Sequence, residues 1–249
     1  MTRTFWLPVG TLWWREMVRF WREKSRVAGF VGSPLIFWLV IGSGFNDLAR
    51  FYPGALTLTV MFSAIFTTMT IIEDRREGFL LSMLVSPAPR SAMVLGKILG
   101  SSTLAWVQGL IMLVFVPLTG LPLHVAGIAG VAGILYLVSF AFTALGFLIA
   151  WRMESSQGYH AVMNLVLFPL WMVSGALFSI GGAHGWMQWV MRANPLTYAT
   201  LALFRLLGAP VDTATPEMGT CLIVMVACSF ALWMAATWSA RKKSKRSNA

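Results

Sequence analysis

The side chains that could do chemistry within the apolar parts of this chain are few, and they are neutral. Thr67, Gln108 and Asn164 stand in long apolar runs, where they could line a cavity or form hydrogen bonds between helices. Carriers driven by protons or sodium ions usually keep Asp, Glu or His at such positions to bind the driving ion. The sequence therefore indicates that any transport by this protein draws its energy from elsewhere.

Residues for nucleotide, metal or hydrolytic chemistry are not grouped along the sequence. There is no Gly-x-x-x-x-Gly-Lys-Ser/Thr motif, so we expect no phosphate-binding loop in this chain. His124, His160 and His184 fall on three separate loops, without Cys or carboxylates at metal-ligand spacing. Ser86 and Ser174 have no candidate base nearby in the sequence. We therefore expect no catalysis, no metal and no cofactor on this chain itself.

Long runs without charge dominate the sequence. Of its 249 residues, 57% are apolar and 11% are charged, whereas soluble chains carry about a quarter charged residues. Asp, Glu, Lys and Arg are absent from five runs, 27–46, 51–72, 98–151, 155–191 and 218–240. A membrane-spanning helix needs about 20 residues, so the third run can hold two helices around a turn at 117–122. The sequence predicts an all-α polytopic membrane protein with six transmembrane helices.

The basic residues predict how the chain is oriented in the membrane. Lys and Arg accumulate on the cytoplasmic side of short loops. With six spans, 16 of the 19 basic residues fall on one side, and the other side keeps Arg50, Arg192 and Arg205. We therefore expect both termini in the cytoplasm. The placement of the +10 net charge favours anionic lipid head groups over nucleic acid as its partner.

An amphipathic helix is expected over residues 11–26. Its apolar face consists of Trp13, Trp14, Met17, Val18 and Trp21. Its basic face consists of Arg15, Arg19, Arg22 and Arg26. Bulky aromatic residues opposite a basic stripe are typical of a helix that lies in the head-group layer. The alternative is an ordinary basic flank that only fixes the orientation of the chain.

Small residues and prolines predict contacts and bends within the spans. Gly96-x-x-x-Gly100, at the start of the third span, is a candidate helix-contact face, although glycine is frequent in membrane helices generally. Pro169 is expected to kink the fifth span.

The loop between the second and third spans is short and charged. A helix that starts near Glu73 would place acidic residues in its first turn and a half, at the positive end of its dipole. It would present Leu80, Leu81 and Leu84 as one apolar ridge, and Pro87 would stop it. A groove in a partner protein would cover such a ridge. The alternative is that the ridge rests on this protein's own helices or on lipid.

The segment before the last span is apolar but interrupted. Glycines at 181, 182 and 185 and the pair Asn194-Pro195 break the chain, and the pieces between them are too short to span a membrane. Irregular backbone at membrane depth needs protein or a water-filled cavity around it. The sequence predicts two short re-entrant helices that dip in from the outer face. Arg205 is expected near that face, directed outward or paired with Asp212 or Glu217.

Two stretches resemble the membrane subunits of type-2 ABC exporters, the ABC-2 permease family. The first is 73–100, and its matching residues are Glu77, Gly78, Leu84, Ser86 and Pro87. The second is 174–207, and its matching residues are Ser174, Gly175, Phe178, Trp186, Asn194, Pro195, Leu196, Thr197, Tyr198 and Arg205. Phe79 and Leu81 stand where the family often has Thr and Glu.

The resemblance implies how the chain is organised. It implies a cytoplasmic segment over 1–26, a six-span domain over 27–240 and a basic tail over 241–249, with a coupling helix at about 73–87 and a re-entrant hairpin at about 181–210. The coupling residues would be Glu73, Arg75, Arg76, Glu77, Gly78, Leu80, Leu84 and Pro87. The hairpin residues would be Trp186, Asn194, Pro195, Tyr198 and Arg205.

The resemblance also implies partners and a function. The expected assembly is a homodimer, or a pair of closely related permeases, above two ABC ATP-binding subunits that hold ATP and Mg. It would export a hydrophobic drug or lipid-like molecule across the bacterial cytoplasmic (inner) membrane. The alternative cargo is a polysaccharide or lipid-linked glycan. A third hypothesis, a membrane enzyme or a scaffold that transports nothing, lacks the clustered His, Asp, Glu or Ser that an enzyme would need near one membrane face.

Overall fold

The computed structural model describes residues 2–22, 24–122, 125–211 and 215–246, and every regular element in these ranges is helical. The elements are α1 (Thr2–Arg22), α2 (Lys24–Gly44), α3 (Leu48–Thr67), α4 (Thr70–Arg76), α5 (Phe79–Val85), α6 (Arg90–Met112), the 3-10 helix η1 (Leu113–Thr119), α7 (Val125–Ala150), α8 (Ser156–Trp171), the π-helical η2 (Met172–Ala176), α9 (Gly185–Ala193), α10 (Pro195–Leu206) and α11 (Met218–Arg246).

Five helical stretches are long and apolar enough to cross a membrane. They are Leu48–Arg76, Arg90–Thr119, Gly127–Ala150, Ser156–Ala176 and Met218–Arg241. They coincide with the second to sixth predicted spans. The first predicted span, at about 27–45, corresponds to α2, whose described apolar part is the shorter Pro34–Gly44. The all-helical, multi-pass character is thus confirmed, whereas the count of six spans stays a prediction.

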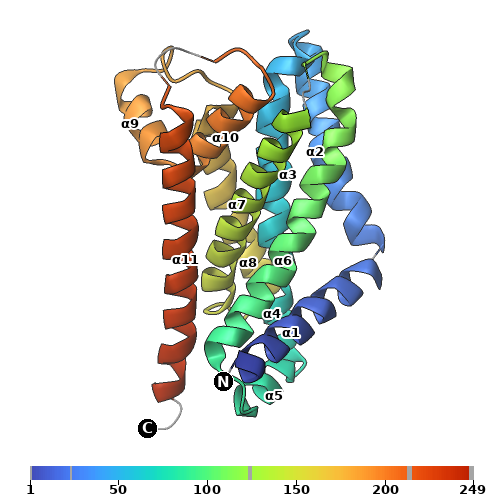
Figure 1. Ribbon diagram of the computed structural model, residues 1–249, viewed down its shortest axis with the longest axis vertical. Coiled ribbons are helices and arrows are strands. Elements are labelled where there is room, and N and C mark those ends of the chain that lie inside the picture. Colours follow the sequence, from blue (N-terminus) through green and yellow to red (C-terminus); the bar gives the residue numbers. More distant parts are fainter. Residues whose placement is uncertain (1, 23, 123–124, 212–214, 247–249) are drawn as a thin grey trace.

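The long helices run side by side along the longest axis of the molecule, and α3 lies among them (Figure 1). Leu56, Val60 and Ile65 on α3 are fully buried. In contrast, the side chains of Ile223 and Phe230 on α11 and of Leu165 on α8 are exposed. Apolar side chains on the outer surface are what a helix needs where lipid replaces water.

Helix α1 is longer than predicted and is turned differently. It begins at Thr2 and lies obliquely across the end of the bundle where α4 and α5 are found (Figure 1). Trp14 and Trp21 are exposed, as an interfacial helix requires. Arg15 and Arg19, however, contact carboxylates of this protein rather than facing away from it. The expectation of an outward basic stripe is therefore wrong for these two residues.

The predicted helix that starts near Glu73 is two helices instead. Helix α4 continues from α3 after a short turn and begins at Thr70, so Glu73 lies in its first turn, Asp74 in its middle and Glu77 at its C-cap, and the dipole argument applies to Glu73 alone. Gly78 separates α4 from α5 with a φ of 76°, a backbone conformation that glycine adopts without the steric cost of a Cβ. Helix α5 ends at Val85, before Pro87, as predicted.

The chain also bends where the fifth predicted span ends. Helix α8 contains Pro169 and passes into η2, whose helical geometry is interrupted at Val173 and at Gly175, which has a φ of 84°. The expected kink is therefore present, a few residues after the proline. Beyond it, α9 and α10 gather at the end of the molecule opposite α5 (Figure 1). Two short helices are thus observed at the predicted place.

Candidate functional site

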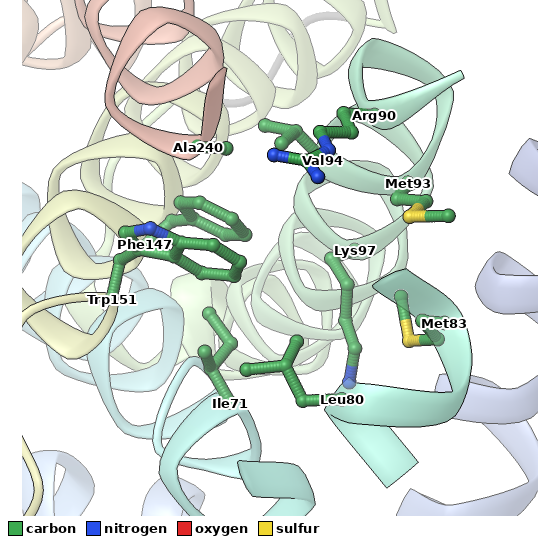
Figure 2. Close-up of a pocket in the computed structure, with 10 residues that line it drawn as sticks. All are labelled: Ile71, Leu80, Met83, Arg90, Met93, Val94, Lys97, Phe147, Trp151 and Ala240. Carbon is green, nitrogen blue, oxygen red and sulfur yellow. The ribbon is translucent and has the colours of Figure 1, made fainter. Parts of the chain in front are cut away.

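Helix α5 turns one side to the bundle and the other to solvent. Leu80 is buried and lines a pocket with Ile71 and Met83 (Figure 2). Leu81 and Val85 are 70% and 79% exposed. The single ridge expected from Leu80, Leu81 and Leu84 is therefore wrong, because Leu80 and Leu81 face in different directions; the side chain of Leu84 lies outside the described part of the structure. Leu80 follows the alternative, in which it rests on this protein's own helices.

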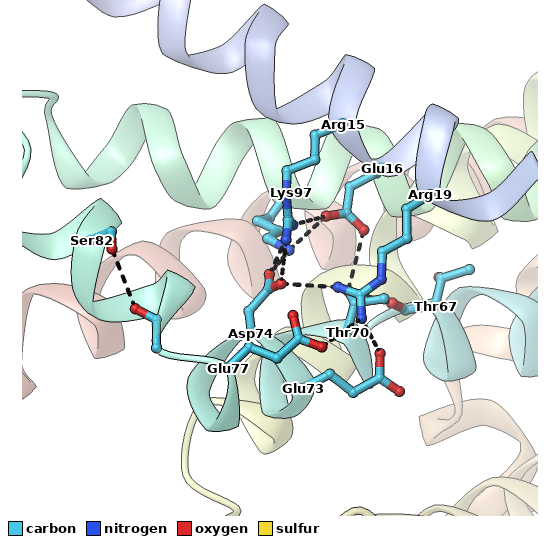
Figure 3. Close-up of polar contacts among 11 residues, drawn as sticks. Arg15, Glu16, Arg19, Thr67, Thr70, Glu73, Asp74, Glu77, Ser82 and Lys97 are labelled. Atoms are coloured by element: carbon cyan, nitrogen blue, oxygen red, sulfur yellow. Dashed lines mark hydrogen bonds and ion pairs between the residues drawn. The ribbon is translucent and has the colours of Figure 1, made fainter. Parts of the chain in front are cut away.

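A group of six charged residues joins α1, α4 and α6 next to α5 (Figure 3). This charged cluster consists of Arg15, Glu16, Arg19, Glu73, Asp74 and Lys97. These six are three basic and three acidic side chains, so their formal charges balance; the exposed Glu77 adds a longer ion pair of 3.7 Å to Arg19 at the edge of the cluster. Removing water from charged groups is costly, and the cost is offset only when the charges are paired and hydrogen-bonded.

Lys97 lies at the buried centre of the charged cluster. Its Nζ is 2.6 Å from Oε1 of Glu16 and also forms an ion pair with Asp74. The side chains of Lys97, Glu16 and Asp74 are 4%, 2% and 0% exposed. Thr70 donates a hydrogen bond to the second oxygen of Glu16 at 3.3 Å. Every one of these charges therefore has a partner on another helix.

Two arginines of α1 complete the charged cluster. Nη2 of Arg15 lies 2.8 Å from Oδ1 of Asp74, and Nη2 of Arg19 lies 2.7 Å from Oε2 of Glu73. Burial alone would lower the pKa of Arg19, but the carboxylates of Glu73 and Asp74 outweigh it and raise that pKa above its usual value. Arg19 is therefore permanently charged. The guanidinium of Arg15 also lies 3.7 Å from the ring centroid of Phe79, so α1 contacts α5 directly.

The two glycines of α6 allow α1 to come this close. A Cβ on Gly100 would lie 2.8 Å from Cβ of Glu16, and one on Gly96 would lie 3.0 Å from Cβ of Leu12. The prediction that Gly96 and Gly100 form a helix-contact face is thus confirmed. With backbones in contact, the Glu16 carboxylate reaches Lys97 one turn further along α6. The two glycines therefore allow α1 to pack closely against α6, and the ion pairs stabilise this contact.

Arg75 and Arg76 hold a different part of the chain. Arg75 donates hydrogen bonds to the carbonyl oxygens of Trp151 and Met153 at 2.6 and 2.8 Å, and Arg76 donates to the carbonyl of Glu154 at 3.1 Å. These carbonyls belong to the connection between α7 and α8. The two arginines therefore fix this connection to α4, whereas Glu77 and Pro87 are exposed.

At the opposite end, Asn194 joins α8, α9 and α10. Its side chain accepts a hydrogen bond from the backbone N–H of Leu196 at 3.0 Å, and its Nδ2 donates to the carbonyl of Leu170 at 2.7 Å. Pro195 follows in the first turn of α10, a favoured place for proline. This side chain thus caps α10 and attaches it to α8.

The other hairpin residues behave differently from one another. The Tyr198 hydroxyl donates a hydrogen bond to the carbonyl of Arg192 at 2.8 Å, and Trp186 is exposed. Nη2 of Arg205 donates to the hydroxyl and the carbonyl of Thr215, at 3.0 and 3.2 Å. No ion pair with Glu217 is found among the described contacts, and Asp212 lies outside the described residues, so the expected pairing of Arg205 with an acid stays a prediction. A carbonyl and a hydroxyl are its described partners.

The three candidate cavity residues do not come together. Thr67 is buried, and its hydroxyl donates to carbonyls of its own helix. Gln108 is buried and accepts a hydrogen bond from Ser63, while its Nε2 has no partner in the described part of the chain. Asn164 lies on the exposed side of α8. Gln108 therefore bonds to a neighbouring helix, one of the two roles expected for these residues, whereas cavity lining stays a prediction for Asn164, which is exposed in this single chain.

The buried ion pairs of Lys97 with Glu16 and Asp74 are the part of the candidate site that the sequence reasoning misses. The available signal is Lys97, which stands within the predicted third span at 93–117. A charge inside a membrane segment pairs with another group or marks function, so a buried partner could have been expected. The alternative interpretation of Lys97, as one more basic residue at the membrane surface, conceals this signal.

The sequence profile of the ABC-2 type transporter family matches residues 8–207, from α1 to the end of α10. The chain belongs to this family. It is 28% identical over 205 residues to the daunorubicin resistance ABC transporter permease protein DrrB1 of Streptomyces coeruleorubidus, covering 76% of this chain and 71% of the relative.

Two further relatives cover similar or larger parts of this ABC-2 chain. The transport permease ycf38 of Cyanophora paradoxa is 27% identical over 198 residues, which are 74% of this chain and 68% of the relative. Nodulation protein J of Rhizobium leguminosarum bv. trifolii is 25% identical over 240 residues, covering 88% of this chain and 91% of the relative. Membership of the family therefore extends over the charged cluster, α5 and the α9–α10 region.

Proposed function

We propose that this chain is the membrane-spanning permease subunit of an ATP-driven exporter. Two copies, or one copy and a close relative, stand above two ABC ATP-binding subunits, which hold the ATP and Mg. Each permease has six spans, with α2 as the first, and both termini in the cytoplasm of a bacterium. Helices α9 and α10 form a re-entrant hairpin at the outer face.

The observation that carries the proposal is the position of α5. It exposes Leu81 and Val85 at the end of the bundle that is rich in charged residues, where water rather than lipid is the expected solvent. Paired apolar residues on such a surface are typical of a docking helix, whose apolar side lies in a groove of its partner. Movement of α5 would pass to α1 through Arg15 and Phe79, and to α6 through Asp74 and Lys97.

Leu81→Asp tests the docking of α5. Leu81 is exposed, so the substitution leaves the bundle intact, but it would place a charge in the apolar contact with the ATP-binding subunit. We expect the variant to be inserted and purified normally, and to lose the ABC ATPase that co-purifies with the wild-type chain from its own cells. ATP-dependent transport should be lost with it.

Gln157→Asp is the matched control, because Gln157 is exposed at the same end of the molecule, in the first turn of α8. An added carboxylate there should leave ATPase recovery unchanged. The proposal is refuted if the wild-type chain purifies without any ABC ATPase, or if Leu81→Asp retains as much ATPase as Gln157→Asp.

The proposed cargo is a hydrophobic drug or a lipid-like molecule, and the name of the daunorubicin resistance relative supports this choice. Cells that produce the permease with its ATPase should accumulate less daunorubicin than cells with the Leu81→Asp variant. The alternative cargo, a polysaccharide or lipid-linked glycan, predicts equal drug accumulation and a loss of surface glycan in cells that lack the permease. A scaffold that transports nothing would retain the ATPase and change neither quantity.

Single cysteines test the proposed orientation. Cysteines at Thr2 and Ser247 should react only with reagents that enter the cytoplasm, because 16 of 19 basic residues lie on that side of a six-span chain. A cysteine at Ala183, between η2 and α9, should react with impermeant maleimide in intact cells. The native Cys221 and Cys228 are first replaced by serine. Labelling of either terminus from outside contradicts the orientation.

A further inference from the structure

A pocket lies beside the charged cluster, lined by residues of α4, α5, α6 and α7 and by Ala240 of α11. Eight of the residues that line it are apolar: Ile71, Leu80, Met83, Met93, Val94, Phe147, Trp151 and Ala240. Phe147 and Trp151 form one wall, and Arg90, Val94 and Lys97 lie across the pocket from them (Figure 2). The rings of Phe147 and Trp151 are stacked, with centroids 5.4 Å apart. This wall offers flat apolar surface to a flexible chain.

Two basic residues line the pocket, and only one of them is available to a ligand. The Nζ of Lys97 is held by Glu16 and Asp74. The guanidinium of Arg90 has no hydrogen bond or ion pair within the described ranges, although it lines the same pocket. In addition, the Nε1 of Trp151 is buried and has no hydrogen-bond partner among the described atoms. The pocket therefore combines an apolar interior with Arg90, a cation that has no partner within the described ranges.

The surroundings of the pocket identify the kind of molecule that reaches it. Ala240 lines it from α11, a helix that exposes apolar side chains to lipid along most of its length. Directly after Ala240 the sequence continues with Arg241, Lys242 and Lys243. Basic residues at the end of a membrane span attract anionic lipid head groups. A molecule that reaches the pocket along α11 is therefore a lipid with an acyl chain. The basic residues at this end of α11 attract lipids whose head groups are negatively charged.

We propose that this pocket, whose space is about 20 Å³, takes a few carbons at the head-group end of one acyl chain of an anionic phospholipid, whose phosphate pairs with Arg90. The pocket is separate from the exposed side of α5 that would dock on the ATPase. It lies beneath α5, since Leu80 and Met83 form part of its lining. A bound lipid would therefore fill the space between α5 and the bundle and support the position of α5.

Photolabelling of the purified full-length chain tests the site. The chain is placed in vesicles of phosphatidylcholine and phosphatidylglycerol that contain a phosphatidylglycerol probe with a diazirine on its acyl chain. After irradiation, mass spectrometry compares the labelling of Val94 and Phe147 with that of Leu165, which is exposed on α8 and serves as the reference for ordinary lipid contact. We expect the pocket residues to be labelled more strongly than Leu165 by this probe.

Arg90→Gln should lower the pocket labelling about five-fold, the factor that corresponds to about 1 kcal/mol per basic residue near anionic lipid. Arg152→Gln is the control, because Arg152 is exposed near Trp151 and does not line the pocket, and it should leave the labelling unchanged. Val94→Phe should abolish pocket labelling by filling the space, while the labelling of Leu165 persists and shows that the variant is folded.

A phosphatidylcholine probe of the same design separates the charge from the apolar pocket. In the wild-type chain, the phosphatidylcholine probe should label the pocket weakly. Its labelling should equal that of the pocket of Arg90→Gln by the phosphatidylglycerol probe. Equal labelling by the two probes, or unchanged labelling of Arg90→Gln, would overturn the proposal. So would pocket labelling that does not exceed that of Leu165.

Discussion

Replacement of Lys97 by methionine removes an ammonium that lies between the buried carboxylates of Glu16 and Asp74. Methionine has nearly the same length and shape, so the change acts mainly on charge. The charged cluster then holds two basic and three acidic side chains, and its balance is lost. Removing one partner of a buried ion pair costs about 3–5 kcal/mol.

The structure places the expected cost near the lower end of that range. Asp74 keeps Arg15 and Arg19 at 2.8 and 3.0 Å, and Glu16 keeps weaker contacts with Arg15 and Thr70 at 3.4 and 3.3 Å. A loss of about 3 kcal/mol corresponds to a fall of about 6–12 °C in the melting temperature of a domain of this size. Intrinsic fluorescence of the protein in detergent measures this fall.

Two further variants decide whether the fall comes from the buried charge. Arg22→Gln removes an exposed arginine at the end of α1, and it should shift the melting temperature by at most about 2 °C. Lys97→Met combined with Glu16→Gln restores equal numbers of charges and should recover about half of the loss. The reasoning is refuted if Lys97→Met melts at the temperature of Arg22→Gln, or if the double variant melts no higher than Lys97→Met.

Two other predictions concern the helix contacts. Gly100→Ala should lower the free energy of unfolding by about 1–3 kcal/mol, and with it the melting temperature, because its Cβ would lie 2.8 Å from Cβ of Glu16 and push α1 away from α6. Gly133→Ala is the control and should leave the melting temperature unchanged, because no atom lies within 4 Å of the added Cβ. Asn194→Ala should remove the cap of α10 and its bond to α8, at a cost of about 1–2 kcal/mol, and speed proteolysis of the segment 181–210. The exposed Asn164→Ala is its control. Proteolysis of Asn194→Ala at the wild-type rate would contradict this assignment.

The positions of the membrane helices can be predicted from the sequence because the bilayer imposes both their length and their lack of charge. The last span, predicted at 218–240, is observed as Met218–Arg241. The break at Gly78 cannot be predicted in this way, because the pattern of apolar and charged residues continues across it without a change in period. A glycine can end a helix in the left-handed conformation or continue it in the right-handed one, and here Gly78 adopts the left-handed conformation while Leu80 packs against the bundle.

The charged cluster could be predicted only in part. Lys97 indicates that some acid must be buried near it, but nine acidic residues are available in the sequence. Glu16 is 81 residues away and Asp74 is 23 residues away, so the choice depends on how three helices pack. Arg15 and Arg19 show the same limit. A basic stripe has helical spacing whether it faces phosphates or carboxylates, and the sequence of α1 alone does not distinguish the two.

The residues of the charged cluster are far apart in the sequence, so they are synthesised at different times. Arg15 and Glu16 leave the ribosome well before Asp74 and Lys97, and at about 5–20 residues per second the last of these follows Glu16 after about 4–16 s. During that interval α1 carries unpaired charges and exposed tryptophans, which suit the surface of a membrane. Its final place is created only when α6 has been inserted. The N-terminal helix is thus made first but takes its final place only after Asp74 and Lys97 have been made.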